Sequence, residues 1–354
     1  MHPPGWGRAI DPSRVGSVGC RPARGAGTLL PIRSRRDRSR ANSRRAFLWE
    51  SAEQKRWPGA GERRRLPNMS GAFREQDRKD EYDGRSGRAA PGRTPGSAEP
   101  GPLHPFRVGC VRALNTVPLC RGLEADLVFA SPAELARRLR SGELDAALVS
   151  VVEPLWHDDY DILDGVAVAC LGEVKSVFLA HRQPLQEMKL VYHDAGSLSS
   201  VALLRVLLAE QGLEPEFQPL PEMAAAAEVD NVLLIGDAAL DFLFAPHEHA
   251  IYDLGVAWYE LTRLPFVFAV WALRRSLDHE PLRRVLREAR DFGMETLDHI
   301  VRERTEYTMD FRKDYLGWHI HYHLGDDEKR GISRFMELLE KHGLGPVYPP
   351  RYVW

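Results

Sequence analysis

The sequence predicts an α/β fold in which residues 106–354 form two lobes around a central ligand cleft. The composition changes abruptly near residue 105, from a basic segment to one with regular apolar runs. Beyond that point short apolar runs alternate with segments of helical period, which is typical of βαβ units around a mostly parallel sheet. A late run, 266–273, is apolar on both faces and therefore predicts a central strand that returns to the first lobe.

Residues 1–105 are a different kind of sequence. They hold 22 Lys and Arg against 11 Asp and Glu, whereas the remaining residues hold 26 against 39. Such a segment buries too little apolar surface to offset the entropy of ordering, so we expect a disordered extension. Upstream sequence translated from an early start, with Met69 as a later one, is a second simple interpretation. A basic tail can also contact nucleic acid or an acidic membrane, but we expect neither partner.

The sequence offers no signal for export, cofactors or cross-links. No run approaches the ~20 apolar residues of a membrane span, and no apolar core of a secretory signal follows the basic start, so a cytoplasmic protein is expected. Nucleotide-binding glycine motifs are missing after the strands, and no cofactor or metal is predicted. The cysteines lack paired spacing and are expected to be free thiols; they are Cys20, Cys110, Cys120 and Cys170.

The clearest helix of the first lobe begins after residue 130. Ser131 is placed to cap it, Pro132 takes its first position, and Glu134 completes a capping box. Gly142 is suited to end the helix. The strands predicted around it, from their apolar content, cover residues 106–111, 127–130, 146–152, 162–170 and 174–180.

The second lobe is predicted as an insertion over residues 184–269, so that residues 106–183 and 270–354 form the first lobe. Its strand 190–193 leads into a helix over 201–211, which Gly212 terminates. The other predicted elements are strands 216–220 and 232–235 and helices 224–227, 256–261, 282–297, 310–315 and 326–342.

Polar and small residues follow several predicted strands, where open α/β sheets bind their ligands. A helix that opens with Gly-Ser-Leu-Ser-Ser offers unpaired backbone N–H groups and a positive dipole end, which suit a carboxylate or phosphate. The sequence therefore predicts a cleft for an anion. The candidate residues are Asn115, Ser150, Ser176, Ser197, Ser199, Ser200 and Asp237.

Each candidate also has a structural interpretation. Ser197 or Ser199 could cap its own helix, which is the commoner role of a serine at that place. Asn115 could be a turn residue. No spacing brings together two of the carboxylates available for acid–base chemistry, which are Glu153, Asp194 and Asp237.

A run of alternating histidines lies near the C-terminus. His319, His321 and His323 would share one face of an extended segment, as three imidazoles at a metal would need. The run lies among predicted helices, far along the chain from the cleft loops. We therefore predict a polar surface there and no metal site.

Six blocks of sequence occur in a characteristic order. They are VGCVRALNTVPL (108–119), PAEL through GELDAALVS (132–150), DAGSLSSVALL (194–204), LLIGDAAL (233–240), YDLGVAWYE (252–260) and LPFVFAVWA (264–272). Together, over residues 107–344, they resemble the chorismate dehydratase branch of the MqnA/MqnD family of menaquinone biosynthesis.

This resemblance implies a fold, a reaction and roles for residues. The fold is that of the type 2 periplasmic binding proteins, and the reaction removes water from chorismate to give 3-[(1-carboxyvinyl)oxy]benzoate without a cofactor. Asn115 aligns with the family's catalytic asparagine, which would polarise the leaving hydroxyl or align the substrate's own carboxylate as an internal base. The residues that would hold the two carboxylates are Ser176, Ser197, Ser199 and Ser200, with Asp237 at the far rim.

The sequence departs from the family pattern at Ala113, Glu173 and Lys175. The last two add charge at the expected cleft, where they either retune substrate preference or pair with each other at the surface. The alternative function is a cytoplasmic binding or sensing protein for a small anion that kept the cleft and lost the chemistry. The naphthoate-forming branch of the same family is disfavoured, because its Ser-Pro block before the first helix has no counterpart here.

Overall fold

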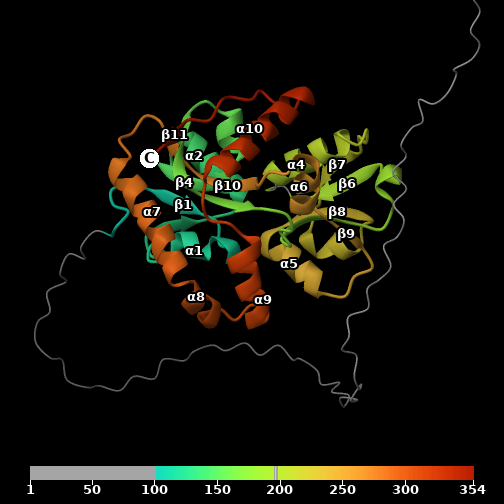
Figure 1. Cartoon of the computed structure of the whole chain (residues 1–354), viewed down its shortest axis with the longest axis horizontal. Helices are drawn as coiled ribbons and strands as arrows, with labels where there is room; N and C mark the ends of the chain where they lie inside the picture. Colours follow the sequence, from blue (N-terminus) through green and yellow to red (C-terminus); the bar gives the residue numbers. More distant parts are fainter. Residues whose placement is uncertain (1–100, 195, 197) are drawn as a thin grey trace, which may run out of the picture. The chain divides into compact units, whose positions relative to one another are not determined.

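The computed structural model describes residues 101–194, 196 and 198–354, so most of the predicted extension lies outside the described residues. The described chain forms two β-sheets with helices around them (Figure 1). The strands of the first sheet, in spatial order, are β11 (Tyr352–Val353), β4 (Tyr160–Cys170), β10 (Phe266–Arg274), β3 (Ala146–Ser150), β1 (Val108–Cys110) and β2 (Leu127–Phe129).

The second sheet repeats the plan of the first. Its strands, in spatial order, are β7 (Glu216–Pro219), β6 (Leu190–His193), β8 (Asn231–Ile235), β5 (Val177–His181) and β9 (Ala250–Asp253). In each sheet one strand runs antiparallel to both of its neighbours: β10 between β3 and β4, and β5 between β8 and β9. The chain therefore crosses twice, from β4 to β5 and from the helix after β9 to β10.

The pairing of strands moves the predicted lobe boundaries. β5 pairs in the second sheet, so the first crossing lies between Cys170 and Val177 and not at residue 183. β10 pairs in the first sheet from Phe266 onward, so the return lies before this residue and not at 270. The apolar runs on either side of each crossing look alike in sequence, and only hydrogen-bonded pairing assigns them to a sheet.

Helix α2 (Pro132–Ser141) starts and ends as predicted. The Ser131 hydroxyl accepts a hydrogen bond from the Glu134 N–H at 3.3 Å, and Pro132 is the first helical residue. Gly142 adopts the left-handed conformation, φ 77°, which ends the helix. The Glu134 side chain does not close the capping box; it binds Arg137 and Arg138 on its own helix.

The remaining helices cover the two sheets. In the second lobe they are α4 (Leu198–Ala209), α5 (Gly236–Phe244) and α6 (Leu254–Thr262), with 3₁₀ turns η2 (Leu185–Glu187) and η3 (Met223–Ala227). In the first lobe they are η1 (Leu114–Thr116), α1 (Val117–Cys120), α3 (Val152–Trp156), α7 (Glu280–Glu295), α8 (Leu297–Glu303), α9 (Met309–Asp314), the π-helical turn η4 (Tyr315–His319) and α10 (Asp326–Lys341). No helix in the described part is long and apolar enough to cross a membrane.

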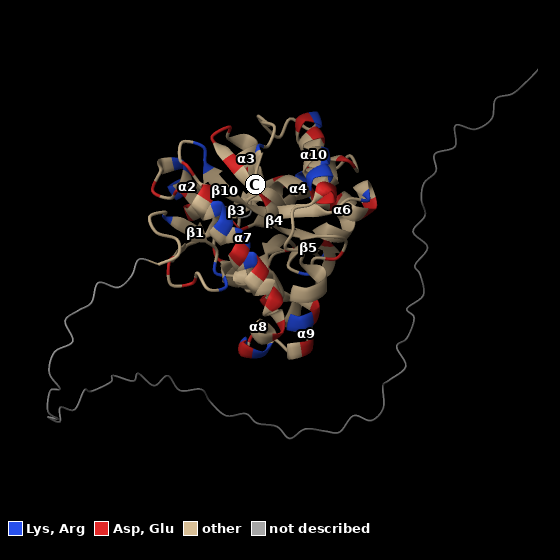
Figure 2. Ribbon diagram, turned by 60° about the vertical axis from the view of Figure 1, so that its left-hand side comes forward, with Lys and Arg blue, Asp and Glu red and all other residues tan. Residues whose placement is uncertain are grey.

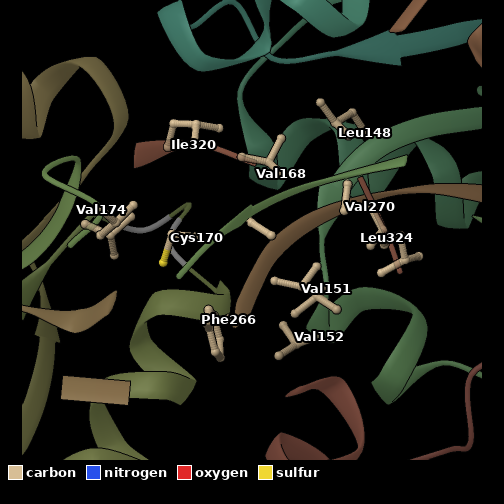
Figure 3. Packing of buried hydrophobic residues seen from close by; sticks show 14 of the residues in the cluster. Leu148, Val151, Val152, Val168, Cys170, Val174, Phe266, Val270, Ile320 and Leu324 are labelled. Atoms are coloured by element: carbon tan, nitrogen blue, oxygen red, sulfur yellow. The ribbon is translucent and has the colours of Figure 1, made fainter. Parts of the chain in front are cut away.

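Apolar side chains fill the space between strands and helices. Figure 3 shows part of this core, in which Leu148, Val168 and Val270 of the first sheet gather near Ile320 and Leu324. Charged residues lie mainly on the outer helices, for example α7 and α10, while the strands carry few (Figure 2).

Aromatic side chains hold the chain in place where it returns from the second lobe to the first, between α6 and β10. Trp258 of α6 is fully buried, its ring lies 5.2 Å from that of Phe266, and its indole N–H donates to the Pro265 carbonyl at 3.0 Å. Helix α10 packs so closely that a Cβ on Gly331 would lie 2.2 Å from the same carbonyl oxygen. The start of β10 is therefore held between one helix of each lobe.

Candidate functional site

A pocket opens between the two sheets, and both lobes line it. The first lobe supplies the loop after β1, the end of β3 and the first half of β10, and the second lobe supplies the start of α4 and the end of β8. The polar and small residues that line it are Asn115, Thr116, Ser150, Gly196, Ser199, Ser200 and Gly236. This is the inter-lobe position in which a ligand contacts both halves of the molecule.

Asn115 lies in η1, directly after β1. The loop is held by Thr116, whose hydroxyl contacts the carbonyl oxygens of Val111 at 2.7 Å and Ala113 at 2.9 Å. These bonds turn the chain sharply, so that Asn115 lines the pocket together with Val111 and Ala113. The predicted catalytic asparagine therefore projects from a short turn that is braced by its own neighbour.

Three of the predicted serines line the pocket. The hydroxyls of Ser150, at the end of β3, and Ser199, in the first turn of α4, are hydrogen-bonded to each other across the two lobes. Ser199 donates to the Phe268 carbonyl at 3.0 Å, so it accepts from Ser150 and does not cap its own helix. Ser200 follows on the same wall, while Ser197 lies outside the described residues.

Ser176 and Asp237 do not line this pocket, and Asp237 lines a neighbouring one together with Ala113 and Thr116. Ser176 is completely buried, and its carbonyl accepts the Gly236 N–H at 2.7 Å. The Asp237 carboxylate accepts the Leu114 N–H at 3.0 Å and so joins α5 of the second lobe to η1 of the first. Burial raises the pKa of Asp237, which the bond from Leu114 partly opposes.

Tyr315, in the π-helical turn η4, is a site residue that the sequence did not indicate. It is completely buried, and its hydroxyl has no hydrogen-bond partner among the described residues. Burial raises its pKa well above the ordinary value, whereas the nearby side chains of Ser176 and Asn115 act to lower it. The phenol therefore lies next to the loop of Asn115. π-helical turns occur often at functional sites. No local sequence pattern, however, predicts that Tyr315 lies beside Asn115, because the two residues are far apart in the chain.

The electrostatics of the pocket come from backbone and hydroxyl groups. Helices α4 and α5 both begin at its wall, so the positive dipole ends of both helices lie there. The first N–H of each helix is already bonded, that of Leu198 to the Gly196 carbonyl at 3.1 Å and that of Gly236 to the Ser176 carbonyl at 2.7 Å. No Lys, Arg, Asp, Glu or His of the described chain lines it. The site can therefore receive a small anion without a cationic side chain, and it has no charged side chain of its own to act as a base.

The other carboxylates considered for acid–base chemistry point elsewhere. Glu153 is buried and accepts from the Arg140 guanidinium at 2.7 Å. The Asp194 carboxylate accepts the Gly196 N–H at 3.0 Å and shapes the turn before α4. Both roles are structural.

Two of the three residues that depart from the family pattern lie in the first crossing loop, while the third, Ala113, lines the pocket. Lys175 and Glu173 pair with each other, Nζ to Oε2 3.1 Å, and neither lines the pocket. The Asp253 carboxylate accepts the N–H groups of Lys175 at 2.8 Å and Gly255 at 2.9 Å, which fastens the loop to the start of α6. Burial raises the pKa of Asp253. This clamp holds Lys175 in its left-handed conformation, φ 62°.

A family model described as menaquinone biosynthesis matches residues 106–341 of the chain. The chain belongs to the menaquinone biosynthesis family. The chorismate dehydratase of Thermus thermophilus is 35% identical to this chain over 261 residues. The aligned residues cover 67% of this chain and 96% of that relative. The resemblance to the chorismate dehydratases found in the sequence is thereby confirmed.

Solved structures were compared with this chain for similarity of fold. The aliphatic sulphonate binding protein SsuA of Escherichia coli matches with a TM-score of 0.48 at 14% identity, over 70% of this chain and 93% of that one. Protein AF1704 of Archaeoglobus fulgidus matches with a TM-score of 0.55 at 19% identity, over 68% of this chain and 99% of that one. With the sheet topology, the second match confirms the predicted two-lobed α/β fold.

Proposed function

We propose that the protein is a chorismate dehydratase, a hydro-lyase that converts chorismate to 3-[(1-carboxyvinyl)oxy]benzoate. The observation that carries the proposal is the inter-lobe pocket, which combines Asn115 with two helix starts in a member of the menaquinone biosynthesis family. The activity in the name of the Thermus thermophilus relative supports it. Chorismate is a dicarboxylate, and the pocket offers N–H and hydroxyl donors to an anion.

The reaction breaks the bond between a ring carbon and its hydroxyl oxygen and removes one ring proton, so water leaves and an aromatic ring forms. Because aromatisation supplies a large driving force, the protein chiefly has to orient the ring and stabilise developing charge. The Asn115 amide is the catalytic group, which donates to the leaving hydroxyl or aligns the side-chain carboxylate of the substrate. That carboxylate serves as the base, since the described pocket lining contains no ionisable side chain.

The serines and the tyrosine complete the site. Ser200, at the start of α4, binds a substrate carboxylate together with N–H groups of the first turn of that helix. Ser199 and Ser150 donate to a carboxylate by exchanging their present bonds, from Ser199 to the Phe268 carbonyl and from Ser150 to Ser199, for bonds to the substrate. Ser150 then binds from the opposite lobe, and Ser197 is proposed as a further carboxylate ligand. Ser176 and Tyr315 form a buried polar layer beside Asn115 that orients its amide. Asp237 contributes by holding η1 at the rim.

The proposal is tested by incubating the full chain with chorismate and following the aromatic product by absorbance and mass. Asn115→Ala is expected to lose turnover by at least about a hundredfold, the size of effect that removal of one such donor has. Ser141→Ala, an exposed position on α2, is the matched control and should be fully active. Full activity in Asn115→Ala would remove this residue from the mechanism.

The second candidate function is a binding or sensing protein for the same class of small anion. It is favoured by the absence of an ionisable side chain from the described lining of the pocket, which suits binding without chemistry. Calorimetry with chorismate separates the two functions. Tight binding without product supports the sensor, and product formation supports the dehydratase.

A further inference from the structure

Two histidines and a glutamate converge at the start of α10, outside the pocket. His321 and His323 are two positions apart in a non-helical segment, so both side chains can reach the same face. Glu328 lies in the first turn of α10. One ligand atom from each residue lies within 4.8 Å of the other two. His319 is turned away, since its ring nitrogens contact the Glu173 carbonyl at 2.8 Å and the Asp314 carboxylate at 3.0 Å.

The distances within this cluster approach those of a metal site. The two imidazole centroids are 5.5 Å apart, and two imidazoles bound at about 2.1 Å to one tetrahedral ion place their centroids about 5 Å apart. Glu328 Oε1 lies 3.2 Å from His323 Nε2, which is a separation that two ligand atoms of one ion can keep. Small side-chain rotations therefore suffice to bring the three donors onto one ion.

Backbone hydrogen bonds already position two of the three donors. The Glu328 side chain is buried, and its Oε2 accepts the Gly325 N–H at 2.9 Å, which leaves Oε1 directed toward the histidines. The backbone of His321 pairs with Ala169 of β4 through bonds of 2.9 and 2.7 Å. Such supporting contacts orient ligands in protein metal sites.

The ring of His321 has an unused polar atom. Its Nδ1 is buried and has no hydrogen-bond partner among the described residues.

We propose that His321, His323 and Glu328 bind a divalent transition-metal ion, of which Zn²⁺ matches best. Two nitrogen donors and one carboxylate suit Zn²⁺, whereas Ca²⁺ and Mg²⁺ prefer oxygen ligands alone. Three protein ligands leave a fourth position for water. A bound ion ties residues 321–323 to the first turn of α10 and so braces the chain between η4 and that helix. The proposal does not depend on the proposed enzymatic function.

The test is calorimetric titration of the full chain, stripped with a chelator, with ZnCl₂. Wild type is expected to bind one ion more tightly than His323→Ala by at least about tenfold. The side chain of His323 is 58% exposed, so its removal leaves the fold intact. His299→Ala is the matched control, because His299 is equally exposed and faces Glu303 at 2.9 Å without a second histidine. It should bind Zn²⁺ as wild type does.

Glu328→Gln supplies an independent variant. Glutamine can still accept the Gly325 N–H, but it lacks the negative charge, so weaker binding of Zn²⁺ is expected. Titration with Co²⁺ adds a spectroscopic readout, since a tetrahedral site with nitrogen ligands gives visible absorption bands that His323→Ala should lose. Unchanged affinity and stoichiometry in both His323→Ala and Glu328→Gln would overturn the proposal, as would failure of wild type to bind Zn²⁺.

Discussion

At the scale of single residues, the site depends on polar groups that are buried between the lobes. Asp237 is the clearest case, because its carboxylate joins the lobes through the Leu114 N–H while burial raises its pKa. The folded state therefore binds a proton at this group more tightly than the unfolded chain does. Its contribution to stability is fully present below the unfolded pKa and is lost as the pH rises through the folded pKa.

Asp237→Asn tests this reasoning. The Asn oxygen can keep the bond from Leu114, and the buried charge disappears, so the variant should melt about 1–3 °C above wild type at pH 7. The gap should narrow as the pH falls and close below about pH 3, where the wild-type carboxyl is neutral in both states. Thermal unfolding across this pH range is the measurement, with exposed Glu288→Gln as the control. A gap that widens toward acid pH would contradict the assignment.

Tyr315→Phe removes only one hydroxyl from beside Asn115. The hydroxyl has no hydrogen-bond partner among the described residues, so the test asks whether it bonds the Asn115 amide once substrate is bound. If it does, the proposed turnover should fall about tenfold, the equivalent of one hydrogen bond, while KM changes little. Tyr352→Phe is the matched control, since its buried hydroxyl also lacks a partner among the described residues but lies at the edge of the first sheet. Equal kcat values for wild type and Tyr315→Phe would make the tyrosine a packing residue.

At the scale of elements, close helix contacts hold the loop of Asn115. Helix α7 lies against α1, which follows η1 directly, and a Cβ on Gly293 would lie 1.8 Å from the Pro118 carbonyl oxygen. Only glycine allows this approach. The position of the loop that carries Asn115 therefore depends on a helix that contributes nothing to the pocket lining.

Gly293→Ala should lower both thermal stability and the proposed turnover. By helix propensity alone, alanine should stabilise α7 relative to glycine by about 1 kcal/mol. A fall in Tm of several degrees would therefore measure the steric cost of the Cβ against α1. Gly317→Ala is the control, because its Cβ would meet the nearest atom at 3.8 Å. Scanning calorimetry and initial rates are the measurements. A variant as stable as wild type would mean that α7 shifts freely.

At the scale of the whole molecule, a ligand between the lobes should stabilise the folded chain. At a chorismate concentration of about 100 times Kd the expected gain is about 2.7 kcal/mol, which corresponds to a rise in Tm of about 5–10 °C. Ser199→Ala removes the hydroxyl that bonds Ser150 and Phe268, so its ligand-induced rise should be smaller. Ser141→Ala should keep the full rise. Equal shifts for both variants would place the ligand away from α4.

Features carried by neighbouring residues were predicted well from sequence. The cap, first-turn proline and terminal glycine of α2 lie as expected, and the run beginning at Phe266 is a central strand. The second-lobe helix near 201–211 and the C-terminal helix near 326–342 also form, with small shifts at their ends. The helix predicted over 282–297 forms as α7, which begins two residues earlier and ends at Glu295, and a separate helix, α8, begins at Leu297.

The sequence by itself determined the type of most elements and placed a helix start with serines near residues 197–200, because periodicity, caps and helix dipoles depend on residues close in the chain. Only the tertiary structure decided which lobe receives β5, that Asp253 clamps the first crossing, that Tyr315 lies beside Asn115, and that His321 and His323 meet Glu328. Each of these depends on which distant segments meet, and that is decided by the packing of the whole domain.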